Sequence, residues 1–291
     1  MSIKGLKRGF TLIELLVVLS IISLLLSIIL PSLNSAKEKA RLSSAKQFSA
    51  NVYHAEADMT ASAWHLDEGT GSSLTDSSGN GNTATLMFYQ GLTNWSTDSP
   101  WSTGSSVSLN GSNNYLRIND KPDFKYKGGN MTLAIWIKPN STENDGGYLF
   151  SKPWNGGGEY NYYIKYMPNG SVTVWLQGDS TYLLATPAVF SKGKWSFLTV
   201  TFDDSRNVNI YVDGALRASG KQLISTWVNS DWNVALSISA QYPYSNPWDL
   251  GSTGAFDGLI DDPAIYTKAL TAMDVGKLYA ETLSSHNFAS R

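Results

Sequence analysis

The sequence contains no cysteine among its 291 residues. Disulfide frameworks and thiolate metal sites are therefore excluded, and any folded part must be held by packing, hydrogen bonds and oxygen-ligated ions. Charge is also scarce, since 16% of the residues are charged and the net charge is −2. No basic cluster follows the N-terminus, so we expect no nucleic-acid binding through phosphate neutralisation. The 25 glycines, 15 tyrosines and 10 tryptophans favour extracellular β structure.

One long apolar run is present, at residues 10–30. A helix of this length extends about 31 Å, which matches the hydrocarbon core of a bilayer. The preceding segment, "MSIKGLKRG", carries Lys4, Lys7 and Arg8 and no acid. This positive flank predicts a cytoplasmic N-terminus, with the chain after Pro31 outside the membrane.

Glu14 is the one charged residue in this apolar run. A carboxylate at bilayer depth costs several kcal/mol and marks a functional position, so Glu14 should have a partner. The length of the run leaves open a secretory signal peptide cleaved after "PSLNSA". Neither that reading nor an uncleaved single-pass anchor explains Glu14.

The stretch "RGFTLIELLVV" resembles the N-terminus of type IV prepilins. A basic leader, residues 1–9, ends at Gly9, Phe10 follows, and Glu14 is the fifth residue of the mature chain. The resemblance implies that a prepilin peptidase cuts between Gly9 and Phe10 and that the new amine of Phe10 is N-methylated. It also implies that Glu14 faces the α-amino group of Phe10 on a neighbouring subunit, a registering contact in low dielectric.

Residues 10–59 are predicted to form one long helix, with 10–30 as its membrane and assembly segment. After Pro31, small and apolar residues recur at helical spacing between lysines, which predicts an amphipathic helix. Pro31 stands where prepilins often have a proline, and it costs a helical hydrogen bond. The implied partners are other pilin subunits, the prepilin peptidase and the inner-membrane pilus assembly machinery.

From about residue 60 the sequence changes to alternating strand patterns. In "MTLAIWIKP" (131–139), Met131, Leu133, Ile135 and Ile137 share one face, and the other face takes Thr132, Ala134, Trp136 and Lys138. "WSFLTVTFD" and "NVNIYVDG" alternate likewise and are predicted to form a hairpin through residues 203–207, and 213–214 (Asp-Gly) is a type I′ turn signal. The expected fold class is α+β: a long N-terminal helix followed by an antiparallel β-sandwich.

Several segments in order resemble the laminin-G-like, concanavalin A-like jelly-roll family: 63–86, 106–118, 131–139, 193–219 and 256–280. The implied boundaries are 60–283 for the jelly roll and 284–291 for a C-terminal tail. "ALTAMDVGKLYA" is expected to be a short closing helix, with Thr271 as its N-cap and Asp274 in its first turn.

Catalysis is not expected in this domain. Some relatives of the jelly roll are glycosidases, whose chemistry needs two carboxylates on either side of a sugar bond. After residue 60 the glutamates are isolated from one another and form no closely spaced Glu–Asp–Glu cluster; they are Glu68, Glu143, Glu159 and Glu281. The sequence has neither a phosphate-binding loop nor a His-rich metal motif.

A structural Ca²⁺ is implied by the jelly-roll resemblance. Asp67, Glu68 and Asp261 match the family's calcium positions, and carbonyls near 110–111 are further candidate ligands. Ca²⁺ takes six to eight oxygen ligands, which carboxylates and carbonyls supply. The alternative is that Asp67 and Asp261 cap turns or pair with Lys or Arg.

Aromatic side chains crowd segments that we interpret as loops. An exposed ring offers a stacking surface to a sugar, although large aromatics in sandwiches usually belong to the core. Tyr242, Tyr244 and Trp248 in "QYPYSNPW" are the ligand-binding candidates. The others are Trp95, Trp101, Trp154, Tyr160, Tyr162, Tyr163, Trp227 and Trp232.

The sequence therefore predicts a type IV pilin-like subunit whose laminin-G-like head binds carbohydrate or protein. We expect a single-pass inner-membrane prepilin with an extracytoplasmic head, assembled into a surface pilus or a periplasmic pseudopilus. The alternatives are a pseudopilin of a type II secretion system and a membrane-tethered lectin that does not polymerise.

Overall fold

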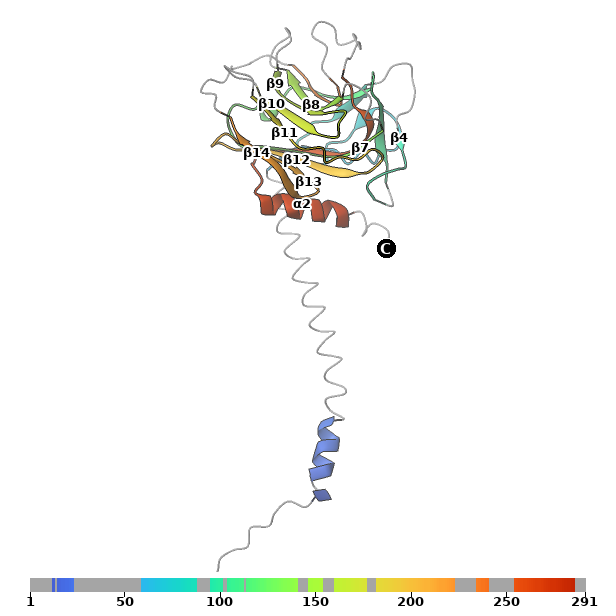
Figure 1. Cartoon of the computed structure of the whole chain (residues 1–291). Coiled ribbons are helices and arrows are strands. Elements are labelled where there is room, and N and C mark those ends of the chain that lie inside the picture. Colours follow the sequence, from blue (N-terminus) through green and yellow to red (C-terminus); the bar gives the residue numbers. More distant parts are fainter. Residues whose placement is uncertain are drawn as a thin grey trace, which may run out of the picture. The chain divides into compact units, whose positions relative to one another are not determined.

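A computed structural model describes residues 12–13, 15–23, 59–87, 95–101, 104–112, 114–140, 146–153, 160–176, 182–222, 234–240 and 254–285 (Figure 1). The chain divides into two compact units, Met1–Asp58 and Met59–Arg291. In the first unit, residues 12–13 and 15–23 are helical. Gly9, Phe10, Glu14 and Pro31 lie outside the described residues, as does most of the predicted 10–59 helix.

The second unit is a sandwich of two antiparallel sheets, as the alternating sequence predicts. Sheet A has the order β14-β13-β12-β7-β16-β5-β4, with β1 also paired to β16. Its strands are β1 (Thr60–Ala63), β4 (Trp95–Ser96), β5 (Ser106–Asn110), β7 (Met131–Pro139), β12 (Ser196–Phe202), β13 (Asn207–Val212), β14 (Ala215–Lys221) and β16 (Asp257–Tyr266).

Sheet B has the order β11-β10-β9-β8-β15-β6-β3-β2. Its strands are β2 (Ser73–Leu74), β3 (Ala84–Met87), β6 (Tyr115–Ile118), β8 (Gly147–Pro153), β9 (Tyr160–Tyr166), β10 (Val172–Leu176), β11 (Tyr182–Ala185) and β15 (Leu236–Ile238). A short 3₁₀ helix, η1 (Pro122–Phe124), follows β6. Strands far apart in sequence are neighbours in both sheets, so the topology is that of a jelly roll and not of a chain of hairpins.

The main core lies between the two sheets. On β7, alternate residues point inward, and Met131, Leu133, Ile135 and Ile137 are all part of this core. The predicted β12–β13 hairpin is confirmed, with Leu198 opposite Val212 and Phe202 opposite Val208. The following turn has positive φ at both central residues, 53° at Asp213 and 74° at Gly214, as a type I′ turn requires.

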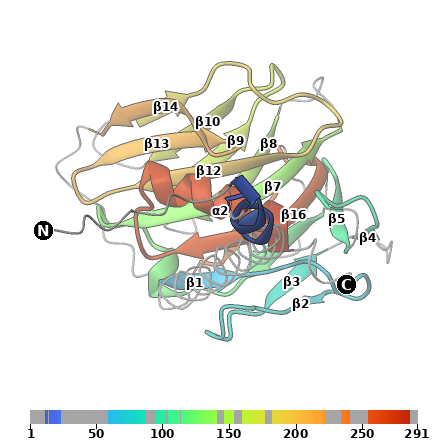
Figure 2. The same ribbon diagram turned by 90° about the horizontal axis from the view of Figure 1, so that it is seen from below.

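A second core lies on the other side of sheet A, under the closing helix α2 (Ala272–Ser285). Figures 1 and 2 show α2 lying across the face of sheet A that points away from β8, β9 and β10. Trp136 from β7 and Phe197 from β12 pack there with Val275 and Leu278 of the helix. α2 therefore covers the part of the outer face of sheet A that β7, β12, β13 and β16 form.

Candidate functional sites

The described residues of the N-terminal helix are apolar except for Ser20 and Ser23. Its large apolar side chains are between 46% and 81% exposed in the isolated chain; they are Leu12, Ile13, Leu15, Leu16, Val17, Val18, Leu19, Ile21 and Ile22. The hydroxyl of Ser20 donates to the carbonyl of Val17 at 2.8 Å, which leaves little polar surface on this turn. A continuous exposed apolar surface of this kind marks a site of association with protein or lipid.

Among the described residues, no helix reaches the length and hydropathy of a membrane span.

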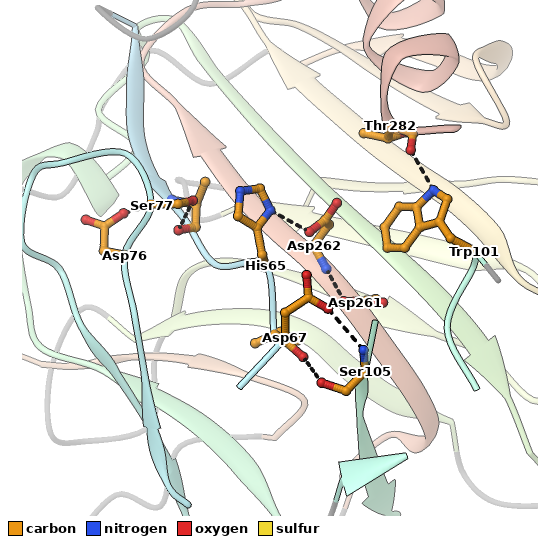
Figure 3. Close-up of polar contacts among 11 residues, drawn as sticks. His65, Asp67, Asp76, Ser77, Trp101, Ser105, Asp261, Asp262 and Thr282 are labelled. Carbon is orange, nitrogen blue, oxygen red and sulfur yellow. Dashed lines mark hydrogen bonds and ion pairs between the residues drawn. The ribbon is translucent and has the colours of Figure 1, made fainter. Parts of the chain in front are cut away.

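In the sandwich, the predicted calcium residues lie where the chain leaves β1 and where β16 is interrupted. The register of β16 shifts between Asp261 and Ala264, and the residues at this irregularity approach the segment after β1. Asp262 and Leu66 both have positive φ, 43° and 55°, so the backbone on each side adopts a conformation uncommon for residues other than glycine. The irregularity brings Asp67, Asp261, Asp262 and His65 together (Figure 3).

Asp261 is the buried member of this group. Its Oδ1 accepts a hydrogen bond from the amide of Asp262 at 3.0 Å, whereas its Oδ2 is buried and has no hydrogen-bond partner. Burial raises the pKa of Asp261 well above its ordinary value, and the negative charges of Asp262 and Asp67 raise the pKa further, against the opposing effect of the Asp262 amide. A buried carboxylate oxygen without a hydrogen-bond donor is stabilised by protonation or by a bound cation.

Asp67 is held in place by a hydrogen bond from the segment before β5. Its Oδ1 accepts a hydrogen bond from the amide of Ser105 at 3.0 Å. A Cβ at Gly104, whose φ is +100°, would stand 2.6 Å from the same oxygen, so only glycine allows this approach. The alternative interpretation, in which Asp67 only caps backbone amides, thus accounts for Oδ1 of Asp67 and not for its Oδ2.

The other predicted calcium ligands, Glu68 and the carbonyls at 110–111, make different contacts. Glu68 Oε1 accepts a hydrogen bond from the amide of Thr75 at 2.7 Å. Asn110 lies opposite Asp257, four residues before Asp261 on β16, which is roughly 13 Å along the strand. The expectation that carbonyls at 110–111 complete the site is therefore wrong.

His65 is a neighbour that the sequence did not predict. Its Nδ1 lies 2.9 Å from Asp262 Oδ1. The hydrogen bond with Asp262 raises the pKa of His65, burial opposes this, and the charges of Asp262, Asp67 and Glu68 raise the pKa further. Within the described part of the chain, no group of three or more His, Asp or Glu side chains is placed to hold a metal ion. Asp67 and Asp261 fit a hard cation only if backbone or solvent oxygens supply its other ligands.

The proposed ligand residues Tyr242, Tyr244 and Trp248 lie outside the described residues. Four other aromatics interpreted as loop residues lie in strands: Trp95 belongs to β4, and Tyr160, Tyr162 and Tyr163 belong to β9. Tyr162 points into the main core, and Trp101 belongs to the second core under α2. Tyr162 and Trp101 are therefore core residues, and the prediction that their rings are exposed for binding is wrong.

The fold is similar to several solved structures. The botulinum neurotoxin serotype D binding domain shares 16% identity with a TM-score of 0.56, over 78% of this chain and 52% of that chain. The botulinum neurotoxin type G receptor binding domain shares 18% identity with a TM-score of 0.55, over 77% and 51%. The chain thus spans about half the length of these neurotoxin domains.

A third solved structure matches along nearly its whole length. Domain 4 of AbnA, a GH43 extracellular arabinanase from Geobacillus stearothermophilus, in complex with arabinotriose, shares 22% identity with a TM-score of 0.56. The match covers 76% of this chain and 98% of that domain. These identities establish the fold alone.

Two sequence families account for most of the chain, while no curated protein matches it. Residues 5–30 match the prokaryotic N-terminal methylation motif, and residues 110–276 match a laminin-G-type family model. The second match covers more than half of the chain and lies within the sandwich. The chain carries an N-terminal methylation motif and belongs to the concanavalin A-like lectin/glucanases superfamily.

Proposed function

We propose that the chain is a subunit of a type IV pilin-like fibre that displays the sandwich as a binding head. The observation that carries the proposal is the exposed apolar surface of residues 12–13 and 15–22, which lies within the N-terminal methylation motif. Such a surface is stable in a membrane before assembly and among packed helices after it.

In this proposal a prepilin peptidase removes residues 1–9, and the new amine of Phe10 is methylated. Glu14 then pairs with the α-amino group of Phe10 on the adjacent subunit, where the low dielectric makes an opposite charge a strong registering contact. Pro31 loosens the helix between its assembly segment and its polar half. The inner-membrane assembly machinery is the remaining partner.

The test is a substitution of Glu14 in the native host. We expect Glu14→Ala to lower the amount of subunit in sheared surface fibres by at least about tenfold, because breaking a buried ion pair costs roughly 3–5 kcal/mol. Glu38→Ala is the matched control, since Glu38 follows the apolar segment, and this variant should assemble normally. Immunogold electron microscopy and quantitative blotting measure incorporation.

Mass spectrometry of the wild-type subunit checks the processing step, with methylated Phe10 as the expected start. An intact Met1 start, or a cut at another position, would contradict the fibre proposal. Short periplasmic fibres would instead indicate a type II secretion pseudopilin. Normal function of Glu14→Ala would indicate a tethered lectin.

We propose binding to glycans or surface proteins, and not catalysis, as the role of the head. Its two described glutamates are both engaged outside any shared cleft: Glu68 bonds the Thr75 amide and Glu281 lies on α2. Tyr242, Tyr244 and Trp248 remain proposed ligand contacts. One structural neighbour carries a bound trisaccharide, which makes a carbohydrate a reasonable first ligand to test.

We also propose a structural Ca²⁺ between Asp67 and Asp261, with Glu68 as a further candidate ligand. The supporting observation is the buried, unpartnered Oδ2 of Asp261 beside a second carboxylate. A cation there would neutralise both carboxylates and join the start of the sandwich to its last strand.

A further inference from the structure

The loop at residues 76–82, between β2 and β3, binds β1 through asparagine side chains. Among the described strands, β1 pairs with β16 alone. Asn80 Nδ2 donates to the carbonyl of Thr60 at 2.7 Å and to that of Ala61 at 3.2 Å. Asn82 Nδ2 donates to the same Ala61 carbonyl at 3.0 Å. These side chains therefore attach the first strand of the sandwich to the loop.

Asn80 is followed by Gly81, and an Asn-Gly pair has a characteristic chemical reactivity. The amide nitrogen of the glycine attacks Cγ of the asparagine, so that a new N–C bond forms, the Cγ–Nδ2 bond breaks and ammonia leaves. Water then opens the resulting succinimide ring at either carbonyl, which gives aspartate or isoaspartate. The reaction consumes only water, and it makes asparagine a thermolabile residue. Glycine favours it because no Cβ obstructs ring closure and the backbone is permissive.

The structure distinguishes the Asn-Gly pairs by their glycine amides. The Gly111 amide donates to the carbonyl of Phe256 at 3.2 Å, and the Gly170 amide donates to that of Met167 at 2.9 Å. Within the described part of the chain, the Gly81 amide donates to no acceptor. A fourth pair lies outside the described residues, at 155–156. Gly81 therefore has the nucleophile that is most available for ring closure.

The asparagine side chains differ in the same direction. Asn110 Oδ1 accepts a hydrogen bond from the Ser112 amide at 3.1 Å. Asn169 Oδ1 accepts two, from the amide of Ser171 at 3.0 Å and from its hydroxyl at 2.7 Å. Asn80 is exposed and is held through Nδ2.

Asn80 must leave the two β1 carbonyls before the ring closes. The reaction therefore occurs during local openings in which the loop releases β1, and such openings are frequent in exposed loops.

We propose that Asn80 is the preferred deamidation site among the described asparagines, and that its deamidation loosens β1. The product has a carboxylate oxygen in place of the Nδ2 donor. This oxygen faces the carbonyl oxygens of Thr60 and Ala61, so two hydrogen bonds are lost and acceptors oppose acceptors. The attachment of β1 to the loop therefore weakens with the age of the subunit, independently of what the head binds.

The first test ages the full chain, purified in detergent, in mildly alkaline heavy-oxygen water and maps its peptides by mass spectrometry. Heavy oxygen enters the product when the succinimide opens, so it marks deamidation during the incubation. We expect Asn80 to react at least about fivefold faster than Asn110 or Asn169, the factor that corresponds to a hydrogen bond of about 1 kcal/mol on the glycine amide. Asn82 precedes the β-branched Thr83 and should remain intact. Equal rates at the three Asn-Gly pairs, or a slower rate at Asn80, would overturn the proposed preference.

The second test measures the consequence for β1. We expect Asn80→Asp to lower the melting temperature by about 2–4 °C or more and to speed hydrogen exchange of the β1 amides. The deamidated fraction of aged wild-type protein should show the same faster exchange, so the result does not depend on the folding of the variant. Asn80→Gln forms the corresponding ring far more slowly and should melt at the same temperature before and after ageing.

Asn169→Asp is the matched control for added charge. Asn169 Oδ1 already accepts the hydrogen bonds from Ser171, which a carboxylate accepts equally well, so exchange of the β1 amides should stay as in the wild type. Unchanged β1 exchange in Asn80→Asp and in the deamidated wild type, or equal acceleration by Asn169→Asp, would contradict the loosening of β1. Neither test requires fibre assembly or ligand binding, so their outcome is independent of the proposed function.

Discussion

At the scale of single residues, the sandwich contains two kinds of buried charge. Lys152, Asp120 and Lys125 form a satisfied group, with ammonium–carboxylate distances of 2.6 and 2.9 Å and a further bond from Lys152 to the carbonyl of Val234. Burial lowers the pKa of Lys152, and Asp120 counteracts this. Asp261 has no such partner for its Oδ2. A bound cation should therefore stabilise the fold more at Asp261 than at Asp120, which already has two ammonium partners.

We therefore expect calcium to stabilise the protein through Asp261. A ligand at about a hundred times its Kd adds about 2.7 kcal/mol, which raises the melting temperature of a domain of this size by about 5 °C or more. Differential scanning calorimetry with calcium and with chelator should show this shift in the wild type but not in Asp261→Asn. Asp98→Asn removes a carboxylate that pairs with Lys138 and accepts a hydrogen bond from Trp195, and it should keep the shift. Equal melting with calcium and chelator in the wild type would remove the calcium proposal.

The sequence predicted these residues unevenly. Asp67 and Asp261 were proposed from the jelly-roll resemblance, and the structure brings them together. His65 and Asp262 join them because of the β16 irregularity, which no local pattern encodes.

At the scale of elements, the sequence alone was enough to predict contacts between residues that are close in the chain. Thr271 and Asp274 bond each other reciprocally: the Asp274 amide donates to Thr271 Oγ1 at 3.2 Å, and the Thr271 hydroxyl donates to Asp274 Oδ2 at 2.8 Å. This confirms the predicted N-terminal cap of α2. The order of strands in each sheet depends on distant segments, and it was not predictable from local patterns.

We expect Thr271→Ala to destabilise the sandwich by about 1 kcal/mol, as loss of an N-cap generally does, and to lower its melting temperature by about 2–4 °C. Thr271→Ser keeps the hydroxyl and should melt as the wild type does. Thermal unfolding followed by circular dichroism measures both variants. A Thr271→Ala variant with unchanged stability would show that packing of Val275 and Leu278 alone holds α2.

The stability that this cap contributes depends on pH, and the pKa of Asp274 gives the direction. Burial would raise the pKa of Asp274, but the hydrogen bonds from Thr271 and the charges of Lys268 and Lys277 outweigh burial and lower it. A lowered pKa in the folded state means that the contribution is present above the ordinary aspartate pKa of about 4 and is lost as the pH falls through the folded value. The difference in stability between wild type and Thr271→Ala should therefore shrink in acid.

At the scale of the whole molecule, the chain divides into two compact units, Met1–Asp58 and Met59–Arg291. The sandwich has two cores of its own, and each is built from residues after Met59. We expect residues 59–291 expressed alone to unfold cooperatively at the melting temperature of the sandwich in the full chain. Calorimetry of both proteins in the same detergent measures this, and a melting temperature lower by more than about 5 °C would contradict independent folding.

The pairing of β1 with β16 has a mechanical consequence. Met59 begins the second unit, and its carbonyl accepts a bond from the Thr267 amide at 2.8 Å, directly beside the β1–β16 pairs. β16 is itself bonded to β7 along its other edge. A force applied to the chain at Met59 is therefore transmitted directly to β16, a strand in the interior of sheet A. In the fibre proposed above, a head tethered in this way would resist unfolding from its first strand when its tether is under tension.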